Sequence, residues 1–111
     1  MKITLIEANQ DLGVKVDGAN LGPHVLTSSL DLDLEVLVVN KPDVIKEKDS
    51  DNLKKNLIAV NKFDEDLYNT CLRVKEKNNF PLVIGGDHTV AIASSLASIK
   101  KEQSLGIIWI D

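Results

Sequence analysis

The sequence has little of what nucleic-acid-binding and membrane proteins need. Aromatic residues make up 4% of the 111 residues, too few for a platform on which bases stack. The formal net charge is −4 and the lysines form no basic stripe, so no surface for a phosphate backbone is predicted. No apolar run approaches the roughly 20 residues that cross a bilayer. We therefore expect no nucleic-acid partner and no membrane partner.

Cysteine is almost absent as well. Cys71 is the only one, so the chain cannot form an internal disulfide. It falls on the apolar side of a predicted helix, which favours a buried core residue over a catalytic thiol. Residues 1–7 hold one lysine and a short, partly alternating apolar run, typical of a strand and not of a signal peptide. We expect a cytoplasmic protein.

The composition that remains is that of a folded domain, with 43% hydrophobic and 27% charged residues. Short apolar runs predict four strands. Two of these runs are rich in β-branched residues or almost continuously apolar, as in parallel sheets that are covered on both faces. The four predicted strands are Ile3–Ile6, Leu34–Val39, Leu82–Ile84 and Leu105–Ile110.

Helical periodicity fills the gaps between these runs. The clearest helix starts near Asp51, because apolar residues from Leu53 to Val74 recur at spacings of three, four and seven. Phe63 and Tyr68 lie on it, and we predict that they are packing residues. A second helix follows His88 and ends near two lysines, and a third runs from Pro23 to about Ser29.

This alternation predicts an α/β fold, a three-layer parallel sheet with crossover helices. His24, in the first turn of the shortest helix, is predicted to be a surface residue without a role. The most apolar strand ends at Asp111 with no further helix to cover it, which suggests that the domain is incomplete.

Two strand ends carry groups that could bind a metal. Ligands of open α/β sheets bind beyond the carboxyl ends of the strands. The run Gly85-Gly86-Asp87-His88-Thr89 follows the third strand, and His88 could offer an imidazole nitrogen. Asp87 could cap the next helix or orient His88. Asp111 follows the fourth strand and is a natural ligand for a hard cation. A tight turn with a surface histidine, and a solvated terminal carboxylate, are the plain alternatives.

These motifs resemble those of the arginase, agmatinase and formimidoylglutamase family of ureohydrolases. Gly85–Thr89 looks like the family's first metal motif. Ile108-Trp109-Ile110-Asp111 looks like the start of the second, which continues Asp-Ala-His-x-Asp. Gly13 to Pro23 resembles the glycine-rich opening loop, and the short N-terminus looks more like arginase than agmatinase. By this resemblance, residues 1–111 are the N-terminal part of a single ureohydrolase α/β domain, truncated at the second metal motif.

The resemblance also implies the chemistry. An intact enzyme would hold two Mn²⁺ ions, with His88 as a ligand of one and Asp111 bridging both. A hydroxide between the metals would convert L-arginine and water to L-ornithine and urea. Catalytic residues are expected beyond residue 111, so the 111-residue piece alone is expected to be inactive. The partner would be a small guanidino substrate, and the intact enzyme a homo-oligomer.

Three alternatives remain open from the sequence. The first is agmatinase or formimidoylglutamase, because nothing up to Asp111 settles the substrate. A nucleotide-binding α/β domain would use Gly85-Gly86 against a phosphate, but the chain has no Gly-x-Gly-x-x-Gly or Gly-Lys-Ser/Thr loop. A non-catalytic scaffold piece would use its uncovered final strand for association.

Overall fold

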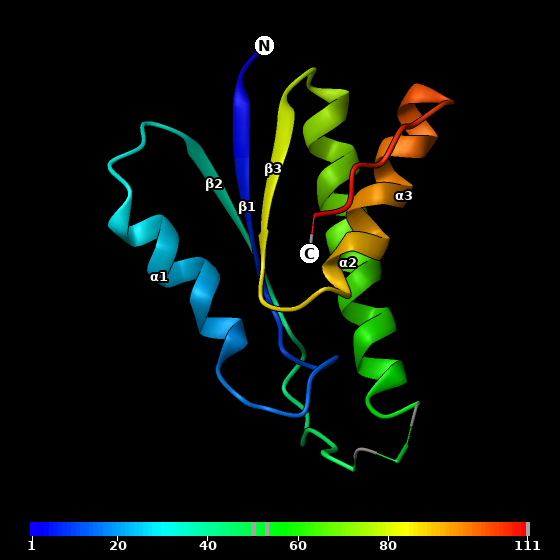
Figure 1. The fold of residues 1–111 in the computed structure, drawn as a ribbon. Helices are drawn as coiled ribbons and strands as arrows, with labels where there is room; N and C mark the ends of the chain where they lie inside the picture. The colour runs from blue at the N-terminus through cyan, green and yellow to red at the C-terminus, as the bar shows by residue number, and fades with distance from the viewer. Residues whose placement is uncertain (50, 53, 111) are drawn as a thin grey trace.

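A parallel sheet of three strands runs through the middle of the molecule (Figure 1). The computed structural model describes all residues except Ser50, Leu53 and Asp111. The sheet order is β2-β1-β3, which confirms the first three predicted strands and their parallel arrangement. The strands are β1 (Ile3–Asn9), β2 (Glu35–Asn40) and β3 (Phe80–Gly85).

Helices cover both faces of this sheet, which confirms the three-layer arrangement (Figure 1). A short 3-10 turn, η1 (Ala19–Leu21), leads into α1 (Gly22–Ser29) on one face. On the other face α2 (Leu57–Glu76) and α3 (Val90–Glu102) pack against each other. Among the described residues, no helix combines the length and hydrophobicity that a membrane crossing requires.

The core lies between the sheet and the α2–α3 pair. The central strand β1 contributes Ile6 and Ala8 to this core. The small residues Ala93 and Ala97 let α3 pack closely against α2. Phe63 is 1% exposed and Tyr68 packs against the cluster, as predicted. Burial raises the pKa of the Cys71 thiol to about 11, which fits a core residue. The buried α2 and α3 members are Phe63, Leu67, Cys71, Val74, Ala93 and Ala97.

The start of the long helix was predicted too early. It begins at Leu57 and not near Asp51. Asn56 has φ 58°, a left-handed conformation that a right-handed helix cannot contain. Its side-chain amide hydrogen-bonds to the backbone of Glu47, so the residue serves a loop instead. Leu53, expected on the apolar stripe, lies outside the described residues.

The prediction of a fourth strand over Leu105–Ile110 is wrong for this structure. That segment follows α3 as exposed, non-regular chain and joins none of the described strands. A strand needs a neighbour for its backbone hydrogen bonds, however apolar its sequence is. The segment runs back alongside α3, as Figure 1 shows in red.

The core predicts a contrast between two leucines of α2. Leu67 is fully buried in the core cluster, whereas Leu57 is 48% exposed. Replacing Leu67 by alanine should lower the free energy of unfolding by roughly 2–5 kcal/mol, because transfer and cavity costs add. Leu57→Ala should cost less than about 1 kcal/mol. Urea unfolding followed by circular dichroism measures both, and equal losses would contradict this core.

Candidate functional site

The candidate site lies where β1 and β3 end side by side. Their register pairs Ala8 with Gly85, and the Gly86 N–H donates to the Ala8 carbonyl oxygen at 3.2 Å. The chain passes from β1 to β2 on one side and reaches β3 on the other, so this is the switch point at which α/β sheets bind ligands. The predicted motif therefore stands at the expected edge. An open pocket there is lined by Gly13, Val14, Gly86, Asp87, His88 and Thr89.

Asp87 joins the two loops that form this edge. Its Oδ2 accepts the Gly13 N–H at 2.8 Å. Its Oδ1 accepts the Gln10 amide at 2.6 Å, the Thr89 N–H at 2.9 Å and the Thr89 hydroxyl at 2.7 Å. The Thr89 contact supports a role for Asp87 at the start of α3. No hydrogen bond within the described chain links Asp87 to His88, so the alternative that it orients His88 directly gains no support.

Gln10 is a site residue that the sequence reasoning missed. It is 1% exposed, and its amide nitrogen donates both to Asp87 and to the Thr89 hydroxyl. Its Oε1 accepts the Leu12 N–H at 2.8 Å, so both ends of the amide are used. His88 was selected because it is a polar residue that follows a predicted strand. The same criterion would have selected Gln10, which follows β1.

Gly86 is required by the close approach of the two loops. A Cβ on it would lie 1.9 Å from the Gln10 carbonyl oxygen and 2.9 Å from that of Ala19. Backbone cannot move aside cheaply, so no other residue fits here. Two carbonyl oxygens at this point also repel a phosphate, which counts against the nucleotide-binding alternative.

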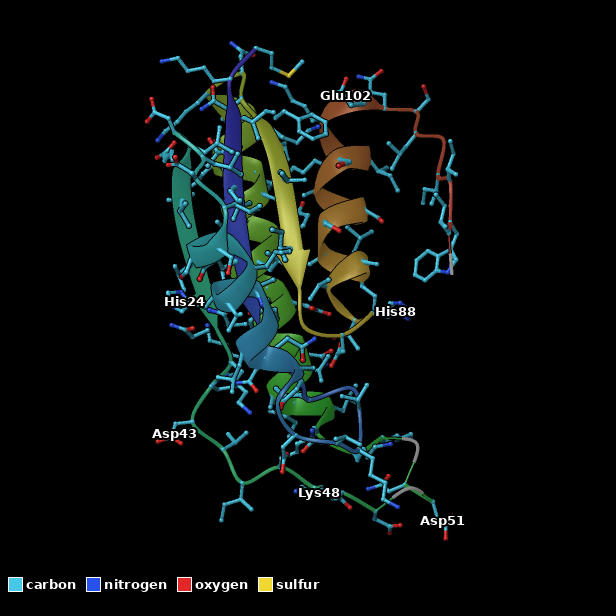
Figure 2. The ribbon with its side chains drawn as sticks, turned by 60° about the vertical axis from the view of Figure 1, so that its left-hand side comes forward. His24, Asp43, Lys48, Asp51, His88 and Glu102 are labelled. Atoms are coloured by element: carbon cyan, nitrogen blue, oxygen red, sulfur yellow. The ribbon has the colours of Figure 1, made fainter. Side chains whose placement is uncertain are left out.

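His88 projects from the turn between β3 and α3 and is exposed (Figure 2). Its ring packs edge-on against Trp109, with 5.5 Å between ring centroids. Trp109 thus lies beside the histidine. Asp111 lies outside the described residues, so its predicted convergence with His88 remains a prediction. In the described part of the chain no three His, Cys, Asp or Glu side chains gather to hold a metal ion.

Asp11 anchors the same edge from the other side. It is fully buried, and its carboxylate accepts the Lys41 ammonium at 2.7 Å and the Gly18 N–H at 3.0 Å. Burial acts to raise the pKa of Asp11. The Lys41 hydrogen bond, the Gly18 N–H and the charges of Lys41 and Lys46 outweigh it and hold the pKa below its ordinary value. These contacts tie the loop after β2 to the loop after β1.

His24, predicted to be without a role, does have a partner. Its side chain is 72% exposed, but Nδ1 lies 3.4 Å from the buried Glu7 carboxylate in β1. The hydroxyl of Thr27 donates to the same carboxylate. These contacts attach α1 to the sheet.

Asp64 of α2 lies close enough to Asp87 for the two carboxylates to repel each other. Its Oδ1 is buried and has no hydrogen-bond partner among the described residues. Burial first, and then the charge of Asp87, raise the pKa of Asp64 to about 6. The folded state therefore resists ionisation of this carboxyl.

A mutation can test the direction of this pKa shift. Ionised Asp64 destabilises the fold, so stability falls as pH rises from the ordinary value of 3.8 to about 6 and stays low above it. Asp64→Asn should raise the free energy of unfolding by roughly 1–2 kcal/mol above about pH 7 and hardly at all below about pH 3. The matched control is Asp66→Asn, an exposed residue paired with Lys62. A pH-independent effect of Asp64→Asn in urea unfolding would refute this cause.

Comparison with known proteins identifies the family. A model of the arginase family matches residues 1–111. Arginase of Bacillus subtilis (strain 168) is 33% identical over 116 residues, covering 98% of this chain and 39% of the relative. Arginase of Bacillus caldovelox is 32% identical over 120 residues, covering 98% of this chain and 40% of the relative. The chain therefore spans about two fifths of the length of these relatives.

Solved structures agree. A crystal structure of arginase from Bacillus subtilis superimposes with a TM-score of 0.66 at 29% identity, covering 91% of this chain and 34% of that one. A second structure of the same enzyme, from strain 168, gives 0.66 over 100% of this chain and 39% of that one. Sequence motif, sheet order and these matches lead to one conclusion: the chain belongs to the arginase family.

Proposed function

We propose that the chain is the N-terminal part of a manganese-dependent ureohydrolase that hydrolyses L-arginine to L-ornithine and urea. The observation that supports this is the position of His88 beside the switch point of the sheet, in a chain that a model of the arginase family matches over residues 1–111. The relatives that match over 98% of the chain are named arginase. Agmatinase and formimidoylglutamase activities are the alternatives, because the residues that choose the substrate would lie beyond residue 111.

The residues at this edge are suited to hold a metal ligand, because the loop that carries His88 is fixed by its neighbours. His88 would hold one Mn²⁺ through an exposed ring nitrogen, and Asp111 would bridge two ions. Bound manganese would supply hydroxide at neutral pH by lowering the pKa of water. Asp87, Gln10 and Gly86 do not touch the metal in this proposal. They fix the backbone from which His88 projects.

The Trp109 contact supports the same arrangement. Trp109 precedes Asp111 by two positions and packs on the ring of His88. An aromatic ring against one side of the imidazole limits its rotation and excludes water from that side. We propose that Trp109 positions His88 for its ligand.

Manganese binding can be tested on this chain because it has an internal control. Mn²⁺ is paramagnetic and broadens the NMR signals of nearby nuclei. On titration, the ring signals of His88 should broaden before those of His24, since His24 lies on α1 and faces Glu7. His88→Asn should remove the preferential broadening of its neighbours Thr89 and Trp109. Equal broadening at both histidines would count against His88 as a ligand.

Activity gives a separate readout. The 111-residue chain with added Mn²⁺ should release no urea from arginine, because one imidazole and one carboxylate cannot complete a two-metal site. Urea release would overturn that expectation. Assays of the full-length protein on arginine, agmatine and formimidoylglutamate would decide between the three substrates.

A further inference from the structure

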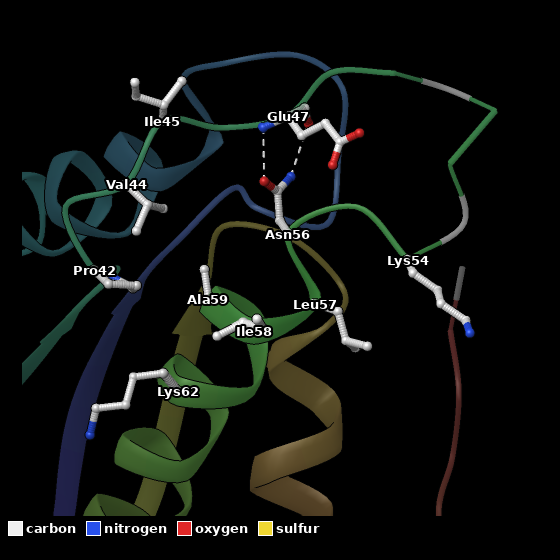
Figure 3. A pocket seen from close by; sticks show the side chains of 10 residues that line it. All are labelled: Pro42, Val44, Ile45, Glu47, Lys54, Asn56, Leu57, Ile58, Ala59 and Lys62. Atoms are coloured by element: carbon white, nitrogen blue, oxygen red, sulfur yellow. Dashed lines mark hydrogen bonds between the residues drawn. The ribbon is translucent and has the colours of Figure 1, made fainter.

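A cavity lies between α1 and the ends of β1 and β2, and it is lined by other residues than the His88 pocket. Its volume of about 630 Å³ is in the range of small-molecule sites. The hollow between residues 42–47 and the first turn of α2 is different, because exposed apolar side chains dominate it and its Asn56 is already hydrogen-bonded to the Glu47 backbone (Figure 3). The cavity beside α1, in contrast, contains polar groups that a ligand could satisfy.

The floor of this cavity is a patch of two cross-strand pairs. Glu7 of β1 lies opposite Val38 of β2, and Asn9 lies opposite Asn40. Alternate residues of a strand share a face, and directly opposed residues of neighbouring strands do so too, so all four side chains project from one face of the sheet. The contacts of Glu7 with α1 show that this is the face which α1 covers.

Glu7 is a buried acid without a full set of donors. Its side chain is 4% exposed. One carboxylate oxygen accepts the Thr27 hydroxyl, and the other lies 3.4 Å from His24 Nδ1, which is longer than an ordinary hydrogen bond. His24 is also a cation only when it is protonated. Because a buried carboxylate is stabilised by several donors or by a cation, Glu7 can accept a further donor group.

Asn9 is a second acceptor on the same floor. Its amide nitrogen donates to Asn40 Oδ1 at 3.1 Å. Its own Oδ1 is buried and has no donor among the described residues. Buried polar atoms are nearly always hydrogen-bonded, so two acceptors that lack donors favour a ligand that brings N–H groups.

Lys41 supplies positive charge at the other end of the cavity. Its ammonium donates to the buried Asp11 at 2.7 Å, and its side chain is still 30% exposed, so N–H donors remain for a ligand. Lys41 comes three positions after Val38, which pairs with Glu7, so about 10 Å of strand separates the two charged residues. This end suits a carboxylate and disfavours a second cation.

Apolar side chains line the space between these two ends. Leu21 of η1 and Val25 of α1 lie on one side, and Val38 lies on the floor. All three are more than half exposed, so an aliphatic chain laid between them would remove apolar surface from water.

We propose that this cavity binds an aliphatic ω-amino acid, a chain with an ammonium at one end and a carboxylate at the other. The ammonium would donate to Glu7 and Asn9, the carboxylate would pair with Lys41, and the methylene groups would lie on Leu21 and Val25. The two charges of a simple α-amino acid sit on one carbon and could not reach both ends. No residue of the proposed manganese site takes part, so this inference stands or fails independently of the proposed function.

An NMR titration of the backbone amides with three small molecules tests the chemistry. δ-Aminovalerate should give saturable shifts at Asn9, Val25 and Asn40 and leave Thr89 unchanged. Butylamine lacks the carboxylate, and putrescine brings a second ammonium toward Lys41, so each should bind about fivefold more weakly or worse. Putrescine that binds as tightly as δ-aminovalerate, shifts at Thr89 in place of the cavity, or no saturable shift at all would overturn the proposal.

Glu7→Gln tests the ammonium contact. The amide keeps the size of the side chain and an acceptor for the Thr27 hydroxyl but loses the charge, so the dissociation constant of δ-aminovalerate should rise about tenfold or more. Glu35→Gln is the matched control, because Glu35 lies on the neighbouring strand and accepts the Thr4 hydroxyl at the opposite end of the sheet. Equal affinities of the two variants would contradict the role of Glu7.

A second pair of variants leaves the buried carboxylate untouched. Val25→Trp should fill the cavity and abolish binding, and the fold should survive because Val25 is 62% exposed. Leu26→Trp places the same side chain next to it on α1, at a position that does not line the cavity, and should leave binding unchanged. Circular dichroism checks that both variants are folded. Unchanged affinity in folded Val25→Trp would show that the ligand binds elsewhere.

Discussion

The edge of this sheet depends on one buried carboxylate. Asp87 receives hydrogen bonds from the loop after β1 and from its own loop after β3, and both of its oxygens are used. A buried carboxylate is stable only with such partners. Gly86 lets the loops come close enough, and Gln10 completes the network. The position of His88 is a consequence of these contacts, because it is the next residue along the same loop.

The rest of the fold supports this edge at some cost. β1 is buried between α1 and the α2–α3 pair, and its end is held by the Asp11–Lys41 ion pair as well as by Gln10. Asp64 works against this arrangement, since its carboxyl is buried near Asp87 without a hydrogen-bond donor in the described chain. Strained or unfavourable groups tend to gather at functional sites, where surrounding structure tolerates them.

Much of the fold could be predicted from residues close together in the sequence. The three strands show as short apolar runs, although only β1 is buried on both faces, and the helices between them show the 3.6-residue period. The position of Gly85–Thr89 at the sheet edge followed from topology alone. Burial of Cys71 followed from its place on the apolar stripe, and Phe63 was predicted to be a packing residue of the same helix.

What could not be predicted depends on distant contacts. Gln10 and Asp87 are hydrogen-bonded although they lie 77 positions apart, and no local sequence pattern predicts this pair. Asn56 interrupts a periodic helix because it is used by the loop at Glu47. Residues 105–110 have the composition of a strand, yet no described strand offers them hydrogen bonds. Composition shows what a segment could form, and its neighbours decide what it does form.

Hydrogen exchange of backbone amides in Asp87→Asn tests the central claim most directly. The amide keeps one acceptor oxygen but places an NH₂ group where a carboxylate oxygen now accepts, so the Gly13 and Thr89 N–H groups cannot both keep their partner. Exchange of Gly13 or Thr89 should accelerate by about tenfold or more, while that of Cys71 in the core stays slow. Unchanged protection at both Gly13 and Thr89 would show that Asp87 does not hold the two loops together.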